Sequence, residues 1–207
     1  MKDDLKILRV FSKTIEQREY PGPTLHDRVF PKFTTSEAKC EPGHEQYALH
    51  KKIRNPEINA MDIEFKKLNK QNKIASVALR RKYRSMIFNA EVNVLKSGFD
   101  IILCTCNEAS SHRIAKSVCP VYCIVDECAM CTEPECMVPI QRAEHVVLIG
   151  DHQQLRPVIK SREAEAKGLG KSLFERYAQK DGEDPPLQEP YMLKKQYRMV
   201  SMHATLN

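Results

Sequence analysis

The sequence predicts an α/β protein built on a parallel β-sheet, and three observations support this fold class. Four short β-rich runs are apolar on consecutive positions: "LKILRVF" (5–11), "FDIILC" (99–104), "VYCIV" (121–125) and "HVVLIG" (145–150). Such runs are typical of strands that are buried on both faces. Polar segments long enough for crossover helices separate them, and the last two runs flank a helical pattern. Strand, loop, helix and strand make a βαβ unit, so we expect right-handed crossovers.

The helix between the last two strands has a clear start signal. Thr132 and Glu135 form a T-x-x-E capping box, and Pro134 stands in the first turn. The threonine hydroxyl and the glutamate carboxylate can satisfy amides that have no partner within the helix. The pattern predicts a helix over roughly 133–142.

The pattern changes between about 36 and 97, where no β-rich run occurs. Apolar residues recur there at helical spacing, namely Leu79, Tyr83, Met86, Ile87, Ala90 and Val94. The segment between Tyr20 and Pro42 is rich in proline, threonine and serine and predicts a loop. We therefore expect a helical insertion at 36–97 between residues 1–35 and 98–207 of the sheet domain.

Composition limits the class of protein. A chain of 207 residues with 42% hydrophobic residues can form one buried domain with an appendage. No run reaches eighteen apolar residues, and the start of the chain lacks the features of a signal peptide. We expect an intracellular protein, cytoplasmic or nuclear, with no membrane partner. Its eight cysteines are then buried small residues, metal ligands or reactive thiols rather than disulfides.

The positive charge is local. The chain carries a net charge of +6, but the stretch between His50 and Arg84 alone carries +8. The remainder is close to −2. A local basic block suits a polyanion partner, although it can equally be a solvated helix face.

Three thiols raise the alternative of a zinc site. Cys128, Cys131 and Cys136 have plausible local spacing, but structural zinc requires four ligands. His145 or Cys123 would have to supply the fourth. Cys136 falls inside the predicted helix, whereas such ligands usually lie on tight turns.

Acidic side chains follow two neighbouring strands of the predicted sheet. Asp126 and Glu127 come directly after the third strand, and Asp151 and Gln154 follow the fourth, where Gly150 allows the chain to turn. The carboxyl ends of parallel strands form the edge at which α/β sheets bind ligands. In nucleoside-triphosphate hydrolases an acid at this edge holds Mg²⁺ on the β- and γ-phosphates. The sequence therefore predicts one shared site at the two strand ends.

Three motifs in order resemble those of a known family. "VDECAMCTEPECMVPI" resembles motif II, "LIGDHQQLRPV" motif III and "LKKQYRM" motif IV of superfamily 1 helicases. The group is typified by the nonsense-mediated-decay RNA helicase and includes the related helicases with zinc finger domains. "FDIILCTCNEASS" and "GKSLFERY" are similar to neighbouring parts of the family, so the resemblance covers roughly 98–200. It implies an incomplete RecA-like first domain of the P-loop NTPase type, with the insertion as a helical stalk.

The resemblance implies roles in ATP hydrolysis. Asp126 would hold Mg²⁺, and Glu127 would be the general base for the attacking water. Gln154 would sense the γ-phosphate, Asp151 would link it to the nucleic-acid site, and Arg198 would contact the γ-phosphate. Gln196 and Tyr197 lie beside Arg198 in the same motif.

The resemblance also implies contacts with single-stranded nucleic acid, RNA being favoured over DNA. Thr105, Cys106 and the Arg156-Pro157 turn would line the strand-binding face. The basic insertion would lie near the bound strand, with Arg80, Arg81 and Lys82 as its contact residues.

The sequence departs from the family in the phosphate loop. These residues contain no G-x-x-x-x-G-K-[ST], and the tempting Gly170-Lys171-Ser172 has Glu165 in the first glycine position. The resemblance places the true loop before residue 1 and a second RecA-like domain after residue 207. Motif IV continues with Val200-Ser201 instead of the usual H-P. We therefore expect an ATP-dependent helicase as parent and no turnover by the isolated chain, the alternative being a non-catalytic nucleic-acid or protein interaction module.

Overall fold

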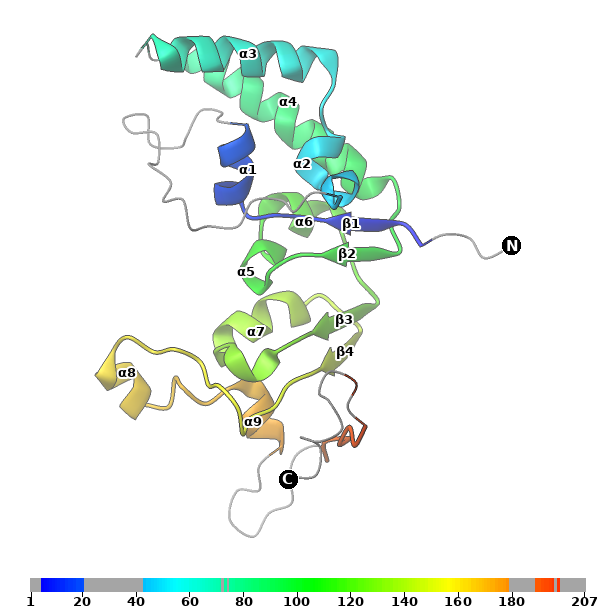
Figure 1. Ribbon diagram of the computed structural model, residues 1–207, viewed down its shortest axis with the longest axis vertical. Coiled ribbons are helices and arrows are strands. Elements are labelled where there is room, and N and C mark those ends of the chain that lie inside the picture. Colours follow the sequence, from blue (N-terminus) through cyan, green and yellow to red (C-terminus); the bar gives the residue numbers. More distant parts are fainter. Residues whose placement is uncertain are drawn as a thin grey trace. The chain divides into compact units, whose positions relative to one another are not determined.

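A computed structural model describes residues 5–20, 43–71, 73, 75–178, 189–195 and 197. The described residues fall into two compact units. The first lies within Met1–Cys123 and Met137–Val146, and the second within Ile124–Cys136 and Val147–Asn207. The predicted loop at 20–42 lies outside the described residues, apart from Tyr20. The elements in chain order (Figure 1) are β1 Ile7–Arg9, α1 Lys13–Glu19, η1 Glu45–Tyr47, α2 Leu49–Lys52, α3 Pro56–Lys70, α4 Val77–Lys96, β2 Ile101–Leu103, α5 Cys106–Ala109, α6 His112–Ser117, β3 Tyr122–Val125, η2 Cys128–Met130, α7 Glu133–Ile140, β4 His145–Leu148, α8 Arg162–Ala166 and α9 Leu173–Ala178.

All four predicted strands form, and they are shorter than the apolar runs. In the first unit β1 and β2 are parallel, with Leu8 opposite Ile102. β3 pairs with β4 in a second two-stranded sheet. The amide of His145 donates to the carbonyl of Val121, and that of Ile149 to Val125. Because the partner residues advance together, β3 and β4 also run parallel, which confirms the α/β class.

The expectation that every strand is buried on both faces is wrong. Leu8 of β1 is fully buried, and Ile102 of β2 packs against the same core cluster. On the other face of β2, Ile101 and Leu103 are exposed, and so are Tyr122 and Ile124 of β3. A strand whose residues are all apolar can be buried on both faces, but only if helices pack against both faces. Among the described residues of the first unit, helices pack against one face of β2.

The apolar periodicity of residues 79–94 is confirmed as helix α4. Ser76 caps this helix, since its hydroxyl oxygen accepts from the amide of Leu79 at 3.2 Å. Near its start Tyr83 packs with Met61 and Phe65 of α3. The other end packs on the sheet core, which contains Leu8, Val10, Leu49, Ile53, Leu95 and Ile114. In Figure 1, α3 and α4 form a helical hairpin that extends away from β1 and β2.

Helix α7 has the glutamate half of the predicted capping box, and the Thr132 hydroxyl binds the same carboxylate. It begins at Glu133, and the Glu135 carboxylate accepts from both the amide and the hydroxyl of Thr132, at 3.1 and 2.9 Å. At the same end Arg176 of α9 binds the Glu133 carboxylate at 2.9 and 2.6 Å. In the second unit, α9 is thereby tied to the start of α7. None of the helices described here is long and apolar enough to span a bilayer.

Candidate functional site

Backbone hydrogen bonds tie the ends of β3 and β4 together in the second unit. Ile149 donates to Val125 at 2.9 Å, and Cys128 donates back to the carbonyl of Ile149 at 2.9 Å. Asp126 and Glu127 lie between Val125 and Cys128, so the acidic turn is held at both of its ends. The predicted convergence of the two strand ends is therefore present.

The structure requires a glycine at position 150 for a different reason from the expected one. Its φ lies outside the left-handed region, so the turn itself does not require glycine. A Cβ here would lie 2.9 Å from the amide nitrogen of Ala129 and 3.2 Å from the Cys128 sulfur. The chain after β4 therefore approaches the backbone of η2 so closely that a side chain does not fit.

Glu127 has a strained backbone. Its φ of 52° and ψ of 34° are left-handed, and it is the only non-glycine residue with positive φ among those described. Its amide donates to the Asp126 carboxylate at 3.1 Å. Such a conformation costs on the order of 1–3 kcal/mol and is concentrated at functional sites. This left-handed residue changes the direction of the chain directly after Asp126, and the side chains of both acids are exposed.

Asp151 is held in a fixed orientation by its own turn. One carboxylate oxygen accepts from the amide of Gln153 at 2.9 Å, and the other from the side-chain amide of Gln154 at 2.8 Å. The backbone hydrogen bond and then the Gln154 contact lower the pKa of Asp151. Asp151 is thus a carboxylate at neutral pH, and Gln154 lies beside it as the strand-end pattern predicts.

The donor set at these strand ends fits Mg²⁺ better than zinc. Carboxylate oxygens are the ligands that Mg²⁺ prefers, and it commonly takes one or two of them together with phosphates and water. No cluster of three His, Cys, Asp or Glu side chains suited to a metal occurs in the part of the chain described here. Cys128 and Cys136 are fully buried. Burial raises the pKa of Cys128 to about 11, as expected of a thiol that packs as a small apolar side chain.

The Gly170-Lys171-Ser172 segment does not have the surroundings of a phosphate loop. It follows helix α8 rather than a strand. The Ser172 hydroxyl oxygen accepts from the amide of Glu175 at 3.1 Å and thereby caps α9. Arg156 donates to the Glu175 carboxylate at 3.2 Å. Pro157, the next residue, is buried. The Arg156-Pro157 turn is thus fastened to α9.

In the first unit a buried arginine fixes the turn that carries Thr105 and Cys106. The Thr105 hydroxyl oxygen accepts from the amide of Glu108 at 3.3 Å and caps α5. The Glu108 carboxylate accepts two bonds from Arg113, at 3.0 and 2.7 Å. Arg113 also binds Glu16 at 2.8 Å and Glu91 at 2.6 Å.

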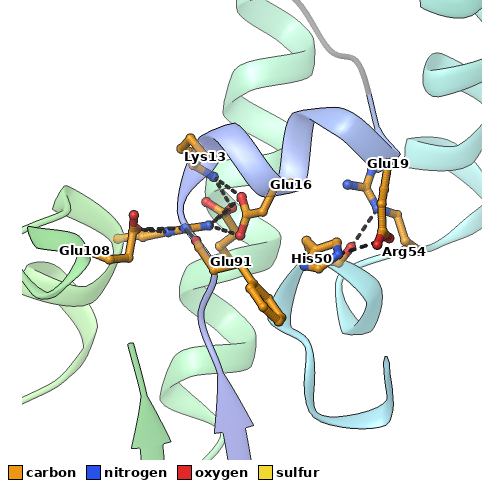
Figure 2. A network of polar contacts seen from close by, with 9 residues as sticks. Lys13, Glu16, Glu19, His50, Arg54, Glu91 and Glu108 are labelled. Carbon is orange, nitrogen blue, oxygen red and sulfur yellow. Dashed lines mark hydrogen bonds and ion pairs between the residues drawn. The ribbon is translucent and has the colours of Figure 1, made fainter. Parts of the chain in front are cut away.

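Figure 2 shows these carboxylates converging from α1, α4 and α5. Arg113 is 2% exposed and Glu91 equally so. Lys13 adds a second cation that pairs with Glu16 and Glu91. The nearby charges raise the pKa of Arg113 despite its burial, so it is always charged. The turn at 105–109 is therefore joined to helices α1 and α4.

The other residues predicted to bind nucleotide or nucleic acid do not contact the strand-end acids or the Arg113 cluster in the part of the chain that the structure describes. Arg80, Arg81 and Lys82 lie on α4, the last two exposed. Tyr197 is largely exposed. Gln196 and Arg198 lie outside the described residues.

Sequence analysis did not find the Arg113 cluster. Its members come from four separate elements and have no common spacing. The sequence feature that could have indicated it is Glu91, which interrupts the apolar residues Ile87, Phe88, Val94 and Leu95 at helical spacing.

Comparison with known proteins agrees with the motifs. The family described as an AAA domain matches residues 3–162. The 3'-5' exoribonuclease HELZ2 of Mus musculus is 35% identical over 96% of this chain, which covers 6% of that protein. The human protein is 35% identical over 95% of the chain and 7% of its own length.

The regulator of nonsense transcripts 1 homolog of Drosophila melanogaster is 37% identical over 73% of the chain and 12% of its own length. The chain thus spans less than a fifth of each of these relatives. The family match confirms the incomplete RecA-like, P-loop NTPase type of α/β fold. The chain belongs to the AAA domain family, as a partial domain of the superfamily 1 helicases of the nonsense-mediated-decay type.

Proposed function

We propose that this chain is part of an ATP-dependent superfamily 1 helicase that couples ATP hydrolysis to movement along single-stranded nucleic acid. One observation carries the proposal. The ends of β3 and β4, each followed by an acid, are tied together by the Cys128–Ile149 hydrogen bond. This is the edge at which an α/β sheet binds its ligand.

The two acids after β3 have different roles in this proposal. Asp126 holds Mg²⁺, which when bound neutralises charge on the β- and γ-phosphate oxygens. Glu127 accepts the proton of the water that attacks the γ-phosphorus, as the bond to the leaving oxygen of ADP breaks. The left-handed backbone of Glu127 supports a functional role for this turn, since such conformations are concentrated at functional sites.

The residues after β4 respond to the nucleotide. Gln154 senses the γ-phosphate, and Asp151 holds its amide and relays the nucleotide state toward the nucleic acid. Their 2.8 Å hydrogen bond supports a shared role. Arg198, with Gln196 and Tyr197 beside it, contacts the γ-phosphate. The domain assignment at 1–35, 36–97 and 98–207 belongs to the same proposal.

RNA is the favoured nucleic acid. The relatives include a protein named as an exoribonuclease and one named for nonsense transcripts. In the first unit Thr105 and Cys106 contact the strand, and Arg80, Arg81 and Lys82 contact its phosphates. In the second unit Arg156 and Pro157 contact the strand. We place this activity inside the cell, in the cytoplasm or the nucleus.

The isolated chain should turn over no ATP. Its 207 residues contain no phosphate-loop motif, and an arginine from a second RecA-like domain is worth on the order of 10³-fold or more in related hydrolases. Measured turnover that Glu127→Gln abolishes would contradict this part of the proposal.

Nucleic-acid binding by the chain can be tested directly. A labelled oligouridylate should bind in a fluorescence anisotropy titration, and its affinity should fall steeply with salt. Arg81→Ala or Lys82→Ala should reduce the slope of log K against log salt by about 0.7 each, because a phosphate contact on a single strand releases about that many counterions. Lys167→Ala is the matched control, since Lys167 is an exposed lysine already paired with Glu163.

A non-catalytic interaction module is the second candidate, favoured by Val200-Ser201, which stand where the family's motif IV has H-P. It predicts nucleic-acid or protein binding that ATP does not change at constant Mg²⁺ and ionic strength. A change in oligouridylate affinity on adding ATP under these conditions would exclude this module, because the competition by salt is then the same in both samples.

A further inference from the structure

The acids and cations of helices α4, α5 and α6 lie in different places. Their acids are Glu91 and Glu108, and both are buried against Arg113. No Asp or Glu occurs between positions 65 and 90. The exposed charges on α4 and α6 are cations, including Arg81, Lys82, Arg84 and Lys116. Burial of the acids therefore leaves cations as the exposed charges of α4 and α6.

A flat pair of rings lies within this cationic surface. The rings of Phe88 on α4 and His112 on α6 are stacked, with centroids 5.2 Å apart and planes 16° apart. The Lys116 ammonium lies 5.6 Å from the centre of the Phe88 ring. His112 is exposed at the start of α6. We call Phe88, His112 and Lys116 the Phe88 platform.

Two arginines extend the platform along α4. Arg81, Arg84 and Phe88 have the i, i+3, i+7 spacing that places residues on one stripe of a helix. At 1.5 Å per residue the stripe is about 10 Å long. Cations next to an exposed aromatic stack are the combination that proteins use to bind single-stranded nucleic acid.

We propose that the Phe88 platform holds one unpaired base of a single-stranded nucleic acid. The base stacks on the exposed ring of His112, which Phe88 supports from behind. Arg81, Arg84 and Lys116 bind the adjoining phosphates. An acidic polypeptide could use these cations, but it would leave the ring stack without a function. This inference rests on the proposed nucleic-acid binding and adds a base-stacking site to it.

The test uses a short oligouridylate that carries one 2-aminopurine, placed at each position in turn. Stacking on an aromatic ring quenches the fluorescence of this base. Binding by the wild-type chain should quench it strongly at one position. Phe88→Leu, which keeps an apolar contact between α4 and α6, and His112→Ala should both abolish the quenching. They should weaken affinity on the order of 5- to 100-fold, the range measured for loss of a stacked base.

Two control variants separate stacking from charge and from general damage. Lys116→Gln should weaken affinity and keep the quenching. Tyr122→Leu removes another exposed ring, which is stacked on His145 at 5.0 Å, and should change neither. Far-UV circular dichroism of each variant checks that the helices remain.

The outcomes distinguish the two proposals. Quenching that survives both Phe88→Leu and His112→Ala overturns the platform and leaves nucleic-acid binding intact. Displacement of the oligouridylate by polyglutamate at equal charge concentration also overturns it, because the surface would then take any polyanion. Absence of binding by the wild-type chain overturns the proposed function and the platform together.

Discussion

The amide of Cys128 donates a 2.9 Å hydrogen bond to the carbonyl of Ile149, and this bond joins the turn after β3 to the end of β4. It brings the acids that follow β3 and the acid that follows β4 to the same edge of the sheet. The contact depends on the small residue that follows Ile149, because Gly150 lies directly against η2.

Replacing Gly150 with alanine should destabilise the chain by about 1–3 kcal/mol, since the new methyl group would meet the Ala129 backbone at 2.9 Å. Gly170→Ala is the matched control, because its nearest atoms are 3.8 and 3.9 Å away. Urea denaturation measures both. Equal unfolding midpoints for the two variants would mean that the strand ends are not closely packed.

Replacing Arg113 with methionine should cost about 3–5 kcal/mol of unfolding free energy. The change removes the guanidinium from the buried carboxylates of Glu16, Glu91 and Glu108. Lys13 still pairs with Glu16 and Glu91, but a buried charge that is not fully compensated is expensive. The control Lys167→Met removes a fully surface ion pair with Glu163 and should change stability by less than about 1 kcal/mol. A cost for Arg113→Met no larger than the control would refute the cluster.

Stability should fall below about pH 6.5 because of His50. Burial lowers the pKa of His50 below its ordinary value of 6.5, against the raising effects of Glu16 and Glu19, while Lys51 lowers it further. The unfolded chain therefore binds the proton first, so the His50 contribution is complete above about pH 6.5 and is lost as the pH falls through the folded-state pKa.

Urea midpoints between about pH 7 and pH 5 should show a shallower slope for His50→Gln than for the wild type. Burial opposes ionisation of Glu19, but hydrogen bonds from Lys51 and His50 lower its pKa below the ordinary value of 4.5. Glu19 therefore adds a further loss of folding stability in a separate range, below about pH 4.5. Identical slopes for the wild type and His50→Gln would contradict the assignment.

The cysteines after β3 should behave as packed side chains. Iodoacetamide at neutral pH should alkylate exposed Cys119 before buried Cys128 and Cys136, because Cys128 is buried with a pKa raised to about 11 and the thiolate is the reactive form. Peptide mass spectrometry gives the order, and the denatured chain is the control. Alkylation of Cys128 that stoichiometric zinc prevents would instead support a zinc site.

The periodic features of the sequence predicted the fold well. Each apolar run contains its strand, and the spacing from Leu79 to Val94 gave the packed face of α4. The capping box gave the start of α7. These features are local, because strand and helix periods are fixed by backbone geometry. For the same reason, Asp126 and Asp151 could be placed at one edge before any coordinates were known.

Features that arise from tertiary packing could not be predicted. The Arg113 cluster combines residues 16, 91, 108 and 113, which no period connects. The left-handed backbone of Glu127 is unusual for a residue that carries a Cβ. Gly150 was expected to serve a turn, and its requirement comes instead from the neighbouring η2 backbone. The burial of the strands failed as a prediction because it depends on which elements cover them.

The central claim is that the ends of β3 and β4 form the Mg²⁺–nucleotide site, and paramagnetic NMR tests it most directly. Mn²⁺ with ATP should broaden amide signals at residues 126–128 and 150–154, since Mn²⁺ takes the same oxygen ligands as Mg²⁺. Asp126→Asn should remove the broadening, while Asp100→Asn, which changes an exposed acid of the first unit, should leave it unchanged. Broadening that is centred elsewhere, or that persists at these residues in Asp126→Asn, would contradict the assignment.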